Sequence, residues 1–266
     1  MATVIAVTNQ KGGVGKTTTS INLAYFLAKA GKKTLLIDFD PQGNASSGLG
    51  IDKSELTGTM TDVVKGSQTL DQIIIETEHK NLYIAPTTSV LANTEAEMAQ
   101  IDKRFSRLKM AIEPLQAAYE YIIIDSPPSL SLLTVNGLIS ARYVLLPVQA
   151  EFYALEGLGQ LLETMKLVRK GMNPSLELLG VLPTMMDTRT TLSNQVHAEI
   201  KRHFPGKVFE STIPRNIRLA EAPSHGIPIG VYDRFSKGSR AYKALAKEVI
   251  ERVEAATTAK QQGGAA

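Results

Sequence analysis

The sequence of 266 residues contains no cysteine. Disulfides, thiolate-bound zinc, iron–sulfur clusters and cysteine nucleophiles are therefore excluded, and a reducing compartment fits. A basic leader is also missing, because residues 1–8 run directly into a strand-like segment rather than a signal peptide. The longest apolar runs, such as residues 121–124 and 143–148, are too short to span a bilayer. These absences predict a cytoplasmic protein.

Size and composition indicate one globular unit. Hydrophobic residues make up 43% of the chain and charged residues 21%, which is ordinary for a folded soluble domain. The length suits one large α/β domain, which we expect over residues 1–256. Residues 257–266 are small and polar, and we expect them to form a disordered tail.

Positive charge is concentrated in the C-terminal third. The formal net charge is +3, but residues 187–247 hold eleven lysines and arginines against five acidic residues, a net of +6. The rest of the chain must therefore sum to −3. This asymmetry predicts a basic surface in the last third of the chain.

Short apolar runs alternate with amphipathic segments, a pattern typical of parallel strands joined by crossover helices. We expect strands at residues 3–8, 33–38, 82–86, 121–125, 143–148, 177–183 and 208–211. Helices are expected at residues 16–30, 102–118, 131–141, 155–171, 192–204 and 237–256. Residues 35–37 and 122–124 are apolar at every position, as in strands covered on both faces. The predicted fold is a mostly parallel twisted sheet between two helical layers, and only residues 42–71 lack a clear pattern.

A glycine-rich segment lies between the first predicted strand and the first predicted helix. Its glycines allow a tight turn whose N–H groups point inward and bind phosphate oxygens, and the helix N-terminus adds a positive end. Lys16 would reach the β- and γ-phosphates, Thr17 would ligate Mg²⁺, and Thr18 would donate to the α-phosphate. A chance glycine-rich turn is the alternative, which the strand–loop–helix setting disfavours. The predicted nucleotide-binding residues are Lys11, Gly12, Gly13, Val14, Gly15, Lys16, Thr17 and Thr18.

Aspartates follow two of the predicted strands. Asp38 and Asp40 end one strand and Asp125 ends another, at the edge where open α/β sheets bind ligands. An aspartate in this position can hold Mg²⁺ through water. A single strand-end aspartate is usually a turn former, but three beside a phosphate loop favour a metal and catalytic site.

The loop departs from the general P-loop pattern, because Gln10 stands where that pattern has glycine and Lys11 precedes Gly12. In this respect it resembles the deviant Walker A loop of the ParA/MinD family of P-loop ATPases. The resemblance implies ATP and Mg²⁺ as cofactors and an ATP-dependent homodimer, in which Lys11 reaches the partner's nucleotide.

The same resemblance distributes the catalytic roles. It places Asp38 in the water shell of Mg²⁺, lets Asp40 position the attacking water, and makes Asp125 the Walker B aspartate. The implied catalytic residues are Lys11, Lys16 and Asp40. The implied metal-site residues are Thr17, Asp38 and Asp125.

Four further segments, residues 40–44, 126–130, 149–157 and 213–224, resemble signatures of the chromosomal ParA (Soj) partition ATPases. The resemblance covers residues 3–254. In that group the turn holding Pro214 and Asn216 lies beside the adenine, although a plain connecting loop is equally open here. The implied function is that of an ATPase whose ATP-bound dimer binds DNA non-specifically and segregates a chromosome or plasmid. The implied partner is a ParB-type centromere-binding protein that stimulates the ATPase.

The loop begins near residue 10, so we expect no N-terminal helix-turn-helix domain, and DNA binding would use the ATPase surface. Arg189 and Arg218 match positions that the family uses to grip DNA. Other basic residues that could add to the patch are Lys201, Arg202, Lys207, Arg234 and Lys237. Phosphate contacts would ignore base sequence, weaken with salt and keep the protein on the nucleoid. For each residue, a solvated basic face is the alternative.

Other functions stay open. MinD-like relatives lie on membranes through a basic amphipathic C-terminal helix. Here residues 251–256 and 261–264 lack bulky apolar anchors, so we expect no membrane contact. An ATPase that positions another cargo, or a metabolic enzyme that transfers phosphate to a small molecule, would carry the same loop. The four histidines are scattered, without the spacing of metal ligands.

Overall fold

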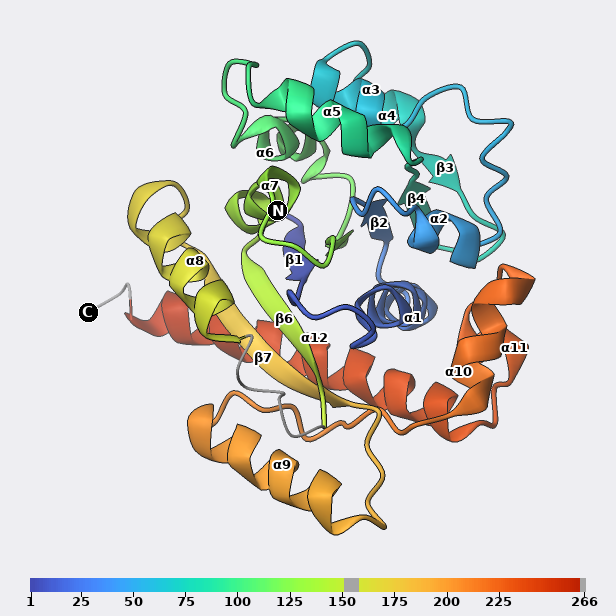
Figure 1. The fold of residues 1–266 in the computed structure, drawn as a ribbon, viewed down its shortest axis with the longest axis vertical. Helices are drawn as coiled ribbons and strands as arrows, with labels where there is room; N and C mark the ends of the chain where they lie inside the picture. The colour runs from blue at the N-terminus through green and yellow to red at the C-terminus, as the bar shows by residue number, and fades with distance from the viewer. Residues whose placement is uncertain (151–157, 264–266) are drawn as a thin grey trace.

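The computed structural model describes residues 1–150 and 158–263, and in them seven strands form one sheet in the order β3-β4-β2-β5-β1-β6-β7 (Figure 1). Its strands are β1 Thr3–Val7, β2 Thr34–Asp38, β3 Ile75–Glu76, β4 Leu82–Ala85, β5 Tyr121–Asp125, β6 Tyr143–Gln149 and β7 Glu177–Thr184. The short β3 pairs antiparallel with β4, and the other pairs are parallel. The predicted mostly parallel sheet is confirmed.

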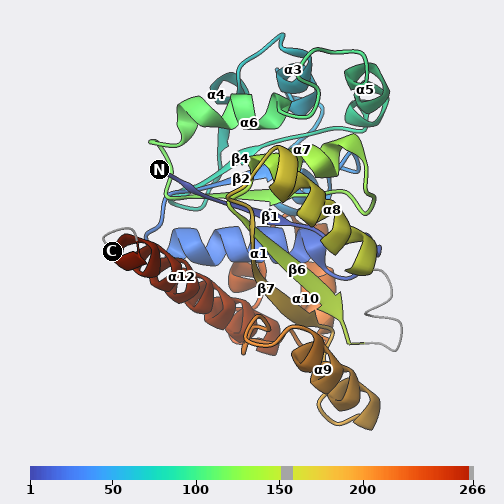
Figure 2. The same cartoon turned by 90° about the vertical axis from the view of Figure 1, so that its left-hand side faces the viewer.

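Helices cover both faces of this sheet (Figure 2). Those packed on one face are α3 Met60–Lys65, α4 Leu70–Ile73, α5 Val90–Met98, α6 Arg107–Ile112, α7 Leu132–Ser140, α8 Leu158–Gly171 and α9 Thr191–His203. Those on the other face are α1 Lys16–Lys29, α2 Asn44–Gly48, α10 Ile217–Glu221, α11 Ile229–Tyr232 and α12 Lys237–Gly263. The result is the predicted three-layer sandwich.

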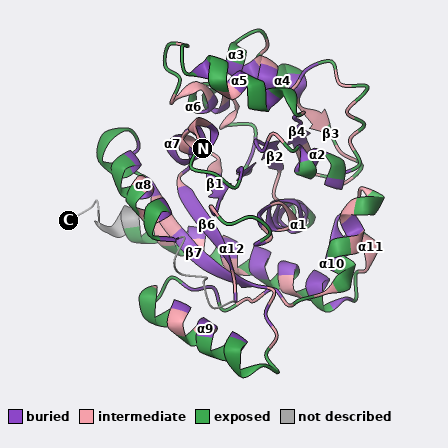
Figure 3. Ribbon diagram, viewed as in Figure 1, coloured by how far each residue is buried: buried purple, intermediate pink, exposed green. Residues whose placement is uncertain are grey.

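The central strands show why their sequence is apolar throughout. In β5, Ile122 and Ile124 pack into the core under α3 to α8, whereas Ile123 packs into the core under α1 and α12. Alternate side chains of a strand point to opposite faces, so a strand covered twice must be apolar at each position. Figure 3 shows the buried strands lying between the partly exposed helices.

The region without a clear pattern, residues 42–71, contains three short helices. The starts of two of them carry a readable signal, because Thr59 with Asp62 and Thr69 with Gln72 form capping boxes at α3 and α4. The predicted helix at 102–118 is α6 followed by a 3-10 turn over Glu113–Leu115, where proline enters the chain. The predicted strand at 208–211 is reduced to one bridge between Val208 and Val181.

The last helix continues further than expected. It ends at Gly263, so residues 257–263, predicted to be disordered, are helical, and residues 264–266 lie outside the described part. The hydroxyls of Thr257 and Thr258 donate to carbonyls four residues back, which suits a helical turn. No helix in the described residues is long and apolar enough to cross a membrane.

Candidate active site

The glycine-rich segment forms a loop between β1 and α1, at the carboxyl edge of the sheet. Gly13 and Gly15 have φ angles of 74° and 87°, in the left-handed region that favours glycine. A Cβ added at Gly12, Gly13 or Gly15 would meet no atom within 4 Å, so the backbone faces open space. Asn9 donates to the Pro147 carbonyl at 2.7 Å and anchors the loop to β6.

Lys16 begins α1 and is buried, with 7% of its surface exposed. Its Nζ donates to the Lys11 carbonyl at 3.1 Å, so the ammonium lies across the loop. Burial lowers the pKa of Lys16, while the carboxylates of Asp125 and Asp40 oppose that shift. A cation held here among carboxylates is placed to meet an anionic ligand. Lys11, in contrast, is exposed.

Asp38 and Asp125 face each other in register at the ends of β2 and β5. Both are fully buried, and burial raises the pKa of Asp38 to about 6 and that of Asp125 to about 8, with the neighbouring carboxylates adding to the rise. Ser20 donates to Asp125 Oδ1 at 2.8 Å. Asp38 Oδ2 accepts from the backbone N–H and the hydroxyl of Ser46, each at 2.7 Å.

The second oxygen of each carboxylate, Asp38 Oδ1 and Asp125 Oδ2, is buried and has no hydrogen-bond partner. Such groups are costly unless a cation or donor meets them. The Thr17 hydroxyl lies near the same carboxyl, where it acts to lower the pKa of Asp125 against the larger effect of burial. These hard oxygen atoms fit Mg²⁺, which commonly takes few protein ligands and completes its shell with water and phosphate. Among the described residues, no group of three or more histidines and acidic residues is placed to hold a metal ion.

Asp40 lies two residues beyond β2 and is 6% exposed. Its Oδ1 accepts the Gln42 N–H at 3.0 Å, which fixes a turn. Its charge influences both Lys16 and Asp38. Lys16, Asp38, Asp40 and Asp125 are thus gathered beside the loop, as the sequence predicts.

A cavity of about 320 Å³ joins the loop to the turn at Pro214 and Asn216. Gly15 and Thr18 line it from the loop side, and Tyr242 of α12 lines it as well. Asn216 Oδ1 accepts the Arg218 N–H at 2.8 Å and so caps α10. The predicted adenine-side residues therefore lie next to the loop, although two hundred positions separate them in sequence.

The predicted DNA contacts are all exposed, but the structure does not gather them in one place. Arg189 follows the carboxyl end of β7. Arg218 follows the Pro214–Asn216 turn, at the start of α10. Lys207 lies instead beside the beginning of β7, lining a hollow with Glu177 and Arg252. The patch is therefore divided between the two edges of the sheet.

Many of these basic side chains already have acidic neighbours. Asp187 accepts two bonds from the Arg189 guanidinium, at 2.8 and 2.7 Å. Arg218 pairs with Glu221 at 2.9 Å and Asp233 at 3.7 Å. Arg202 pairs with Glu199 at 2.6 Å, and Lys201 with Glu210 at 3.5 Å. Four of the seven predicted DNA contacts, Arg189, Lys201, Arg202 and Arg218, are therefore already paired with an acidic side chain.

Sequence reasoning missed Ser20 and Ser46, which hold the two aspartates. Ser20 follows Lys16 by one helical turn on the same face of α1, and that spacing was a readable signal. Ser46 lies in the segment whose secondary structure was not predicted. The resembling segment at 149–157 lies outside the described residues except for Gln149 and Ala150.

The chain is similar in sequence to proteins of known family. The family model described as "AAA domain" matches residues 2–178. The sporulation initiation inhibitor protein Soj of Bacillus subtilis (strain 168) is 52% identical over 249 residues, covering 94% of this chain and 98% of Soj. The chromosome partitioning protein ParA of Myxococcus xanthus (strain DK1622) is 49% identical over 249 residues, covering 94% and 88%.

Among solved structures, a cobyrinic acid a,c-diamide synthase from Mycobacterium smegmatis with bound ADP and magnesium matches with a TM-score of 0.84 and 35% identity. The match covers 96% of each chain. The geometry of the phosphate loop, the three-layer fold and the sequence identity to Soj and ParA all indicate the same family. The chain belongs to the ParA and Soj family of chromosome-partitioning P-loop ATPases.

Proposed function

We propose that this protein binds ATP with Mg²⁺ at the loop of residues 11–18, hydrolyses it, and uses the cycle to partition DNA. The observation that carries the proposal is the pair of buried carboxylate oxygens, Asp38 Oδ1 and Asp125 Oδ2, left without partners beside a buried lysine. This pattern is expected where a divalent cation and a polyphosphate complete the site.

Each residue has a distinct task. The N–H groups of residues 12–18 and the Lys16 ammonium bind the phosphates, while Thr17, Asp38 and Asp125 hold Mg²⁺ directly or through water. When bound, Mg²⁺ offsets the charge of the phosphates. Asp40, held by its bond from Gln42, orients the attacking water. Lys11 stabilises the charge on the nucleotide of a second subunit, so that hydrolysis depends on dimer formation.

DNA binding and a partner protein complete the proposed cycle. The ATP-bound dimer would contact DNA phosphates through Arg189 and Arg218, with smaller contributions from the other basic residues. A ParB-type centromere-binding protein would stimulate hydrolysis and release the DNA. The similarity to chromosome-partitioning proteins of Myxococcus xanthus and Treponema pallidum supports this assignment.

The test is an ATPase assay with DNA and a ParB-type protein, each alone and both together. We expect a slow basal rate and a synergistic rise when both are present. A rate indifferent to both would remove the partition function while leaving nucleotide binding intact.

A second candidate follows from the similarity to the diamide synthase, whose name describes an enzyme of small-molecule metabolism. The identity to that protein, 35%, is well below the 52% to Soj. The two functions separate in a DNA co-sedimentation assay with ATP, because only a partition ATPase should bind DNA in a nucleotide-dependent manner.

A further inference from the structure

Ser46 is a buried residue of α2 that joins three elements near the aspartates. Its hydroxyl donates to Asp38 Oδ2 at 2.7 Å, and the same hydroxyl accepts the Thr87 N–H at 3.1 Å. Its own backbone N–H donates to Asp38 Oδ2, also at 2.7 Å. A continuous chain of hydrogen bonds therefore runs from the residue after Pro86, beyond β4, to the carboxylate at the end of β2.

The two bonds from Ser46 act on only one oxygen of Asp38. With Oδ2 occupied by two donors, Oδ1 is left as the buried oxygen without a partner. A carboxylate held in this way cannot rotate to present its other oxygen without losing both bonds. Partners behind metal-binding groups commonly fix ligand orientation by such hydrogen bonds.

The segment between Asp38 and Ser46 is itself packed closely against Thr87. Gly43 has a φ of 62°, and a Cβ placed there would lie 2.6 Å from Lys53 Nζ and 2.9 Å from the Thr87 carbonyl oxygen. Thr87 thus approaches Gly43 with its carbonyl group and bonds Ser46 with its N–H. Thr87 therefore contacts the chain at both Gly43 and Ser46, directly after the turn that begins at Asp40.

The neighbouring serine shows a different arrangement. The Ser47 hydroxyl bonds to the Gly43 carbonyl four residues earlier, at 3.3 Å, and Ser47 is exposed. That bond is the ordinary local one for a serine in a helix. The hydroxyl of Ser46 is instead directed at a carboxylate eight residues away.

We propose that Ser46 is a positioning residue for the metal site: its hydroxyl transmits the position of the chain after β4 to Asp38 and keeps Oδ1 turned toward Mg²⁺. The inference rests on the proposed function, in which Asp38 faces the cation. It adds a residue whose contribution is to the affinity for Mg²⁺ rather than to the affinity for the nucleotide itself.

The experiment measures binding of a fluorescent ATP analogue across an Mg²⁺ titration, and again in EDTA. Ser46→Ala should raise the half-saturating Mg²⁺ concentration by about 10-fold or more, the usual cost of losing a partner behind a metal ligand. Nucleotide affinity in EDTA should stay within about 2-fold of wild type. Ser46→Thr keeps the hydroxyl and should restore the Mg²⁺ dependence. Ser47→Ala is the matched control and should leave it unchanged.

Three results would overturn the proposal. They are an unchanged Mg²⁺ titration for Ser46→Ala, an equal loss for Ser46→Thr, and an equal loss for Ser47→Ala. If Ser46→Ala does not fold, Ser46→Cys preserves the volume with a weak donor and should show the same shift. Asp38→Asn distinguishes a failure of the proposed metal role of Asp38 from a failure of the proposed positioning role of Ser46. If that variant also titrates like wild type, the proposed metal role of Asp38 fails; if it alone is impaired, only the Ser46 inference fails.

Discussion

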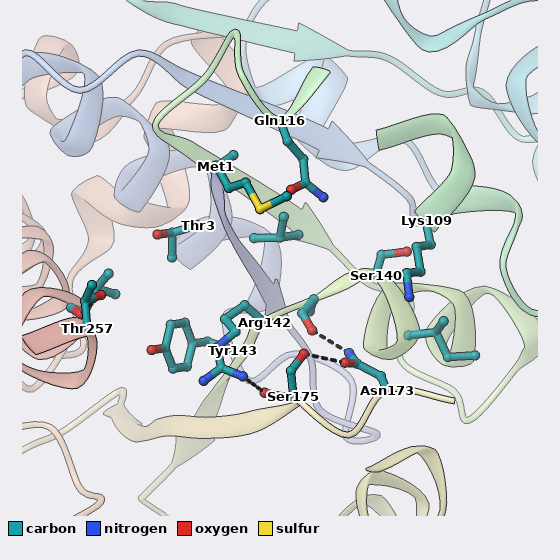
Figure 4. A pocket seen from close by; sticks show the side chains of 15 residues that line it. Met1, Thr3, Lys109, Gln116, Ser140, Arg142, Tyr143, Asn173, Ser175 and Thr257 are labelled. Carbon is teal, nitrogen blue, oxygen red and sulfur yellow. Dashed lines mark hydrogen bonds between the residues drawn. The ribbon is translucent and has the colours of Figure 1, made fainter. Parts of the chain in front are cut away.

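The two edges of the sheet differ in how their buried polar groups are partnered. The cavity at the amino edge, about 520 Å³, is larger than the one of about 320 Å³ beside the loop. Several of its polar side chains bond one another: Arg142 bonds to Ser175, and the Ser175 hydroxyl donates to Asn173 Oδ1 at 2.7 Å (Figure 4). Arg142 donates to the Ser175 carbonyl and to Glu177, and Asn173 donates to the carbonyls of Leu138 and Ala141.

The carboxyl edge is arranged in the reverse way. There the buried groups include Asp38 Oδ1 and Asp125 Oδ2, which have no partner, next to a lysine whose pKa is lowered by burial. A protein tolerates such groups where a ligand completes them. What distinguishes the carboxyl edge is therefore two unpartnered carboxylate oxygens beside a buried lysine, and not the size of a cavity.

The largest effect is expected from Lys16→Ala. Removing the ammonium that lies across the loop should lower ATP affinity by about 100-fold or more, because a buried charge-assisted contact to phosphate is lost. Arg142→Ala, at the amino edge, should leave ATP affinity within about 2-fold. Isothermal titration calorimetry with both variants checks this. Equal losses in the two variants would show that the edges are not functionally distinct.

Asp40→Ala should separate binding from hydrolysis. Loss of the residue that orients water should reduce kcat by about 100-fold or more, while ATP binding and ATP-dependent dimers persist. Size-exclusion chromatography with ATP, together with a phosphate-release assay, measures both properties. Undiminished hydrolysis would remove Asp40 from the catalytic role and leave it as a turn former.

A smaller effect is expected for DNA. Arg189→Ala and Arg218→Ala, at the carboxyl edge, should each weaken non-specific DNA binding by about 5- to 10-fold and reduce the salt slope by about 1. Lys207→Ala, at the other edge, should have less than half that effect on the slope. Fluorescence anisotropy across a salt series measures it. A response independent of salt would argue against phosphate contacts altogether.

The sequence was sufficient for the parts of the site that depend on local pattern. The glycine loop, Lys16 and the strand-end aspartates all follow from a strand–loop–helix order that brings them to one edge. Asp38 and Asp125 meet because the strands are parallel and adjacent in the sheet. These features can be predicted from the spacing of the apolar residues and from the groups that bind phosphate and Mg²⁺.

Other parts could not be predicted, because they depend on contacts between distant segments. The bond from Thr87 to Ser46 links the loop after β4 to α2, 41 positions away in sequence, and no local pattern encodes it. The pairing of Arg189 with Asp187 and of Arg218 with Glu221 altered the expected basic patch, since a count of charges does not show which neighbours meet. The end of α12 was misplaced because a small polar composition is compatible with helix as well as with disorder.

The last prediction concerns the pH dependence of stability in EDTA. Burial raises the pKa of Asp125 to about 8, whereas an aspartate in the unfolded chain titrates near 3.9. Between these values the folded protein binds more protons than the unfolded chain, so the free energy of unfolding should increase as pH falls. We expect Tm to rise by a few degrees, about 2 to 4 °C for each kcal/mol gained, as the pH falls from 8 to 6.

Asp125→Asn should flatten this dependence, and Mg²⁺ with ADP should flatten it in wild type, because a bound cation keeps the carboxylate ionised. Glu177→Gln, at the amino edge, should retain the slope. Scanning calorimetry of wild type and the two variants measures these slopes. A wild-type Tm that falls between pH 8 and pH 6 in EDTA would contradict the raised pKa of buried Asp125 as the cause of the pH dependence.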